Sequence, residues 1–123
     1  MAKMRVEFIA RFYMGEDDAV LVAADRDGID QLAGAIRQAC QPIGSPSVLR
    51  ANQRTHVFMT EAGGGTIEFR NGDVIWRLSK ERMEEIADKL ESMKESPGPC
   101  HHYVEIVAPA STLILSRDEY PDR

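Results

Sequence analysis

Cysteine, histidine and tryptophan are scarce in this chain of 123 residues, which holds two cysteines, three histidines and one tryptophan. Two cysteines are too few for the disulfide framework of a small secreted domain, and they fit a reducing compartment. Charged residues interrupt every apolar segment well before the roughly 20 residues that a membrane helix needs. The first residues contain no apolar run of signal-peptide length. We therefore expect a cytoplasmic protein.

The chain also lacks an excess of basic residues. It has 15 lysines and arginines against 20 aspartates and glutamates, a formal net charge of -5. Nucleic acids and anionic membranes repel a net acidic protein at long range, so neither is an expected partner, and a basic partner is favoured. With 43% hydrophobic residues, the sequence predicts one folded domain over residues 1–123, with a flexible tail from about residue 117.

Two amphipathic helices with the same spacing are the clearest signal in the sequence. Asp25 and Ser79, which are 54 residues apart, are residue types that cap helix N-termini. Apolar residues follow both caps at the same offsets and describe one buried stripe on each helix. The predicted helices run from about residue 27 to 41 and from residue 80 to a stop before Pro97. The stripes consist of Ile29, Leu32, Ala33, Ile36 and Ala39, and of Met83, Ile86, Ala87, Leu90 and Met93.

The other segments have strand patterns separated by turn residues. Residues 4–14 alternate apolar side chains with others, as in a strand with one buried face. Further strands are predicted at residues 19–24, 48–50, 55–61, 66–70, 74–78, 103–108 and 112–116. Asn71-Gly72 is a strong hairpin signal between two of them. We therefore predict an α+β fold, an antiparallel and mostly meander sheet with both helices packed on one face.

The repeated spacing has two explanations. An internal duplication with an offset of 54 residues would produce it. Two helices that cross the same face of one sheet would also need the same stripe, whatever their origin. Few residues match between the two segments, which favours the second explanation.

Cys100-His101-His102 is the nearest approach to a metal or nucleophile cluster. A metal site needs three or four ligands, so this run would have to recruit His56 or a distant carboxylate. Neighbouring residues on a strand point to opposite faces, so a Cys-His nucleophilic pair would also need His56 as its base. We therefore predict no metal, no cofactor, no catalytic residue and no enzymatic activity.

A resemblance to a protein class comes from two parts of the chain. These are the Asn71-Gly72-Asp73 turn leading into Val74-Ile75-Trp76, and the closing stretches at residues 102–106 and 113–120. Together with the acidic α+β layout, they resemble the small immunity proteins encoded beside bacterial polymorphic or contact-dependent toxins. The resemblance implies a stoichiometric inhibitor that occludes the active site of a toxin, and it transfers no functional residue.

The main functional hypothesis is therefore a binding protein whose acidic surface meets a basic toxin domain. Turn and tail residues are the candidate contacts, with one aromatic ring as an anchor. A small enzyme or ligand-binding domain with a pocket near His56 and His102 is an alternative, and a homo-oligomeric structural domain that pairs through a strand edge is another. The candidate partner-binding residues are Asp17, Asp18, Glu61, Asp118, Glu119 and Tyr120.

Overall fold

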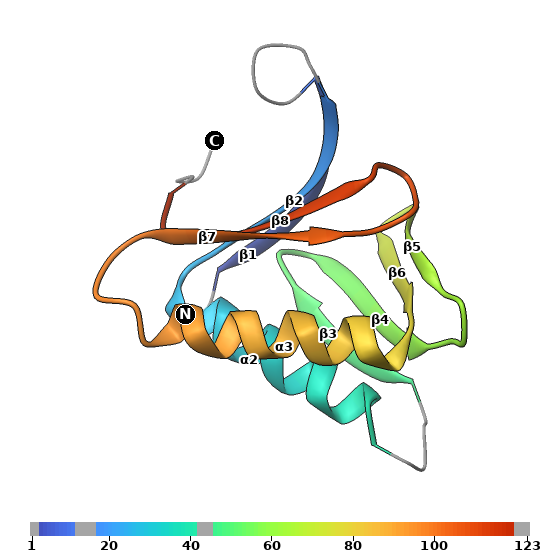
Figure 1. Cartoon of the computed structure of the whole chain (residues 1–123), viewed down its shortest axis with the longest axis horizontal. Coiled ribbons are helices and arrows are strands. Elements are labelled where there is room, and N and C mark those ends of the chain that lie inside the picture. The colour runs from blue at the N-terminus through green and yellow to red at the C-terminus, as the bar shows by residue number, and fades with distance from the viewer. Residues whose placement is uncertain (1–2, 12–16, 42–45, 120–123) are drawn as a thin grey trace.

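The computed structural model describes residues 3–11, 17–41 and 46–119, and in these it places two helices and eight strands (Figure 1). The predicted α+β class is confirmed. None of the described helices is both long enough and apolar enough to cross a membrane. The elements are β1 (Met4–Arg11), β2 (Asp17–Ala24), α2 (Arg26–Ala39), β3 (Ser47–Ala51), β4 (Arg54–Thr60), β5 (Gly65–Arg70), β6 (Asp73–Leu78), α3 (Lys80–Lys94), β7 (Cys100–Glu105) and β8 (Thr112–Arg117).

The strands form two sheets of four strands instead of the single meander sheet that we expected. Sheet A has the order β1-β2-β8-β7, and sheet B has the order β3-β4-β6-β5. Each sheet consists of two antiparallel hairpins that are joined by a parallel pair, β2 with β8 and β4 with β6. The hairpins follow from local turn signals, whereas the parallel pairs join segments far apart in the sequence.

Both helices begin at the predicted caps. The side chain of Asp25 accepts a hydrogen bond from the Gly28 N–H at 2.7 Å, and Ser79 Oγ accepts one from the Arg82 N–H at 3.1 Å. These bonds satisfy N–H groups that have no partner inside the helix. The two helices lie side by side (Figure 1), and Arg37 of α2 joins them through Asp88 of α3 at 2.6 Å.

One hydrophobic core is shared by both helices and both sheets. Every residue of the two predicted stripes is buried, and Leu32, Ile36, Ile86 and Leu90 are fully enclosed. Trp76 is also fully buried and packs on Phe58, with ring centroids 5.0 Å apart. We expected both helices to pack on one face of a single sheet. Instead, the two helices together cover a core that two sheets share.

The order of elements is repeated. β1-β2-α2-β3-β4 and β5-β6-α3-β7-β8 have the same sequence of hairpin, helix and hairpin, and exchanging one set for the other reproduces all the strand pairings. Each sheet takes one hairpin from each half. Two helices that merely share a sheet face do not require this repeat of the strands, so the structure favours the duplication that we ranked second.

Candidate functional site

The structure does not bring the predicted contact residues together on one surface. Asp17 and Asp18 begin β2, while Asp118 follows β8, which runs parallel to β2. The two groups therefore lie at opposite ends of sheet A, about 20 Å apart at 3.3 Å per residue. Glu61 follows β4 in sheet B. Tyr120 and the side chain of Asp17 lie outside the described part of the chain.

Asp118 and Glu119 are held at the end of sheet A. The Asp118 N–H donates to the Ala24 carbonyl at 2.9 Å, and Asp118 Oδ2 lies 3.2 Å from Arg117 Nε. Glu119 accepts a hydrogen bond from Ser116 Oγ at 2.6 Å and lies 3.0 Å from His101 Nδ1. Burial opposes ionisation of Glu119, but the bonds from Ser116 and His101 outweigh it and lower the pKa of this carboxyl below its usual value.

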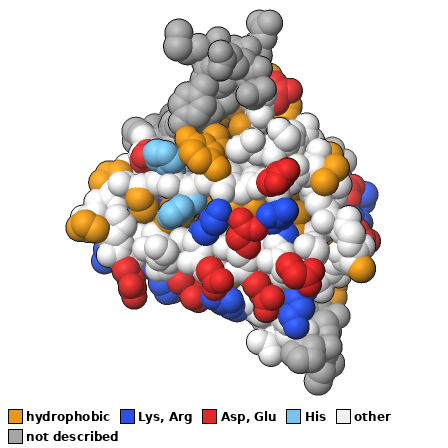
Figure 2. Space-filling view, in the orientation of Figure 1, with side chains coloured by type: hydrophobic (Ala, Val, Ile, Leu, Met, Phe, Trp, Pro, Cys, Tyr) orange, Lys and Arg blue, Asp and Glu red, His pale blue; other side chains and the backbone are white. Residues whose placement is uncertain are grey.

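An aromatic side chain contacts the histidine that pairs with Glu119. Tyr103 is 44% exposed and contacts His101 edge-to-face, with ring centroids 5.3 Å apart. Figure 2 shows histidine side chains next to hydrophobic ones on this face, whereas acidic and basic side chains alternate over the helices. We call His101, Tyr103, Asp118 and Glu119 the sheet-end patch.

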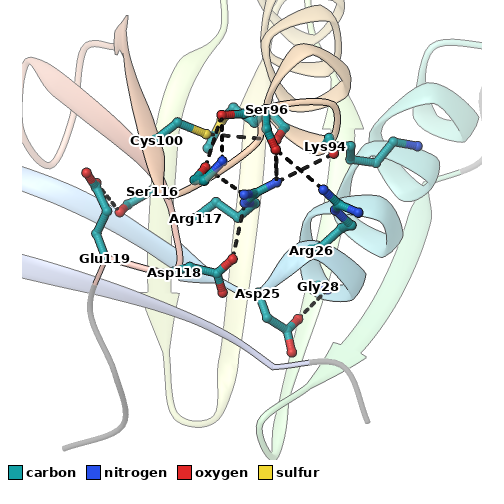
Figure 3. Close-up of polar contacts among 12 residues, drawn as sticks. Asp25, Arg26, Gly28, Lys94, Ser96, Cys100, Ser116, Arg117, Asp118 and Glu119 are labelled. Carbon is teal, nitrogen blue, oxygen red and sulfur yellow. Dashed lines mark hydrogen bonds and ion pairs between the residues drawn. The ribbon is translucent and has the colours of Figure 1, made fainter.

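A buried arginine supports this end of the sheet (Figure 3). Arg117 is the last residue of β8, where we expected the tail to begin, and it is 4% exposed. Its guanidinium donates to the carbonyls of Met93 at 2.9 Å, Ser96 at 3.2 Å and Gly98 at 2.6 Å. It thereby satisfies carbonyls at the C-terminus of α3 that lack helical partners. No local pattern predicts this contact, because residues 93 and 117 are distant along the chain.

An open hollow of about 310 Å³, solvent space at its mouth included, lies between β1 and the β3–β4 hairpin. We call it the β1-edge pocket. His56 lines it, whereas His102 is not one of its lining residues, so the predicted pocket contains only one of the two histidines. Its described lining mixes two arginines, a glutamate, an asparagine and a histidine with apolar side chains, so it can bind a polar group. The lining residues are Met4, Arg5, Val6, Glu7, Ala51, Asn52, Arg54 and His56.

His56 is a neutral hydrogen-bond donor in this pocket. Its Nδ1 accepts a hydrogen bond from the indole N–H of Trp76 at 3.3 Å, which leaves the proton of the neutral ring on Nε2. Burial and then the positive charge of Arg54 lower the pKa of His56 to about 4. No described residue accepts a hydrogen bond from Nε2. Sequence inspection singled out His56 but missed Arg54, although the two lie two residues apart on β4 and so share a face. It also missed Asn52, which enters from the turn between β3 and β4.

The described residues contain no group of three histidine, cysteine, aspartate or glutamate side chains that could hold a metal ion. Cys40 and Cys100 are free thiols that belong to different elements. No protein-family model, curated protein or solved structure matches the chain.

Proposed function

We propose that this chain acts by binding another protein, as an immunity protein that neutralises a bacterial toxin in a stoichiometric complex. The sheet-end patch is the observation that supports this function most directly. It combines two ordered carboxylates with an exposed aromatic ring, which is the composition of an interface anchor with a charged rim.

The order of the patch favours binding. Glu119 has two hydrogen-bonding partners and Asp118 is fixed through both its backbone and its side chain, so little side-chain freedom is lost when a partner docks. The negative charges would speed association with a basic surface and set its register. Asp17, Asp18 and Glu61 remain candidate contacts for a partner that extends beyond this patch.

The experiment compares two double charge reversals that change the net charge equally. Asp118→Lys with Glu119→Lys removes the acidic part of the patch, whereas Glu81→Lys with Glu84→Lys changes two exposed residues of α3. The product of the adjacent gene is the partner to test, in a co-expression growth assay and in binding kinetics at two salt concentrations. We expect only the patch variant to lose protection and to bind at least tenfold more slowly at low salt.

Two results would contradict the proposal. A neighbouring gene product that is harmless to the host would remove the immunity function. Equal protection and equal association rates for both double variants, with circular dichroism spectra like the parent's, would remove the sheet-end patch as the binding surface.

A further inference from the structure

The repeated topology gives β1 and β5 equivalent positions, and among the described residues a further segment covers the outer edge of β5 but not that of β1. The Val107 N–H donates to the Gly65 carbonyl at 2.8 Å, and the Ile67 N–H donates to the Ala108 carbonyl at 3.0 Å. Ala108 also forms a parallel bridge with Thr66. The connection from β7 to β8 therefore adds a short extended segment to the edge of sheet B.

No such segment covers the edge of β1 in the described part of the chain. Val6 pairs with Val22 as Ile67 pairs with Trp76, so Val6 is the equivalent of Ile67 and Met4 the equivalent of Gly65. The β7–β8 connection has six residues, whereas the equivalent β3–β4 connection is only Asn52 and Gln53. The short turn does not extend along β1, and the β1-edge pocket lies where the longer connection would run.

The backbone of β1 offers hydrogen bonds to this pocket. The Asp25 N–H donates to the Lys3 carbonyl at 3.1 Å, so these residues form a hydrogen-bonded pair of the antiparallel ladder. Hydrogen-bonded and non-hydrogen-bonded pairs alternate along such a ladder. The N–H and C=O groups of Met4 and Val6 therefore point away from β2, on the side of the pocket that both residues line.

The rim of the pocket is locally basic although the chain is acidic overall. Arg54 is exposed and forms no ion pair with any described residue. The His56 ring adds a neutral N–H donor, and Glu7 lies 3.3 Å from Arg5, which offsets that charge. A carboxylate is the complement of Arg54 in this setting.

We propose that the β1 edge binds an extended, carboxylate-bearing peptide segment of a partner protein. The segment would run parallel to β1, donate one N–H to the Met4 carbonyl and accept one hydrogen bond from the Val6 N–H. These bonds reproduce what Val107 and Ala108 make with β5, and they are the bonds of strand addition to a sheet edge. The proposal concerns a surface other than the sheet-end patch and does not depend on the immunity function.

The contact of residues 107–108 with β5 also predicts which residues the bound peptide prefers. A Cβ atom at Gly65 would lie 2.7 Å from Val107 Cγ2, so glycine on β5 makes room for a valine on the added segment. Met4 has a side chain at the equivalent position of β1. The peptide residue that passes Met4 must therefore be glycine, with the acidic residue after it.

The probe is the peptide acetyl-Val-Gly-Asp-Val-amide, added to the ¹⁵N-labelled full chain. We expect saturable amide shifts at Met4–Glu7 and Ala51–His56 in NMR spectra, the two segments that line the pocket. Replacing aspartate by lysine, or glycine by valine, should weaken binding about tenfold or more. Replacing the glycine by N-methylglycine should do the same, because it removes the donor to the Met4 carbonyl.

Matched protein variants locate the carboxylate. Arg54→Ala should weaken binding of the aspartate peptide about tenfold. Arg50→Ala on the adjacent strand should not, because the Arg50 side chain donates to Thr55 Oγ1 and does not line the pocket.

The proposal would be wrong if the peptide did not bind at millimolar concentration, or if the N-methylated peptide bound equally well. Saturation of the same shifts by acetate alone, with no further effect of the peptide, would make the pocket a site for small anions instead. A concentration-dependent dimer with the Val6 amide at its interface would assign the edge to a second copy of this chain.

Discussion

His56 occupies a position that is apolar in the other half of the molecule. It pairs with Val74 in β6 as Leu113 pairs with Val20 in β2, so His56 and Leu113 are equivalent. Both are buried, but His56 brings a ring whose protonated form is disfavoured by burial and by Arg54. The exchange of leucine for histidine gives the β1-edge pocket a polar wall.

The burial of His56 predicts an acid-sensitive stability. The unfolded chain binds the His56 proton near the ordinary pKa of 6.5, whereas the folded chain binds it only near 4. The neutral, buried His56 therefore contributes its full share to the free energy of unfolding above about pH 6.5. As pH falls toward 4, the free energy of unfolding decreases by roughly 3 kcal/mol from this residue. Urea unfolding of the parent and of His56→Leu between pH 7 and 4 measures it. A parent and variant that lose stability in parallel would refute the role of His56.

Arg117 is a second buried polar residue, and its role is structural. Arg117→Met removes the donors to the Met93, Ser96 and Gly98 carbonyls and leaves acceptors unpaired at the end of α3. We expect a loss of about 2–4 kcal/mol in the free energy of unfolding, measured by urea titration. Arg50→Ala is the control, because Arg50 is exposed and should change stability by less than about 0.5 kcal/mol. Equal stability of the two variants would contradict the capping role.

At the scale of elements, α3 is held in the fold by its buried apolar face. Leu90 of α3 is fully buried in the shared core. Leu90→Ala should cost about 2–5 kcal/mol in the free energy of unfolding, from lost apolar burial and the cavity left behind. A loss below about 1 kcal/mol would contradict the packing of α3 described here.

Two glycines of α2 give a matched test of the helix surface. A Cβ atom at Gly34 would meet no described atom within 4 Å apart from its chain neighbours and the backbone of its own helix, whereas one at Gly28 would overlap the Lys3 carbonyl oxygen. Gly34→Ala should stabilise the chain by about 0.5–1 kcal/mol, because alanine loses less conformational freedom in a helix. Gly28→Ala should instead destabilise it, because the backbone beside β1 must move. Thermal unfolding of both variants checks the prediction, and effects of the same sign would contradict it.

At the scale of the whole molecule, neither half can complete a sheet alone. Each sheet takes one hairpin from each half, and all elements but β3 contribute fully buried or nearly buried residues to one core. We therefore expect a single cooperative unfolding transition. Trp76 is the only tryptophan and is fully buried in sheet B, so its fluorescence reports the core while far-ultraviolet circular dichroism reports the helices. Unfolding midpoints that differ between the two signals would show that the halves unfold separately.

Local signals in the sequence were sufficient to predict the elements. The stripes after Asp25 and Ser79 predicted both helices and their caps, because a helix period and a capping side chain act within a few residues. The strands β2, β4, β5, β6 and β8 also lie within about two residues of their predicted bounds. β7 begins at Cys100, three residues before the predicted start, because its ladder with Arg117 extends the strand.

Only the tertiary structure decided how the hairpins combine. The parallel pairs β2–β8 and β4–β6 join segments that no local pattern links, because a strand edge offers the same backbone groups to any partner. The tertiary arrangement buries Arg117 against the end of α3 and separates Asp18 from Asp118. It also brings His56 and Arg54 of β4 to an edge of β1 that no described segment covers. The sequence by itself determined the two capped helices and the hairpins, whereas the sites depend on contacts between residues that are distant along the chain.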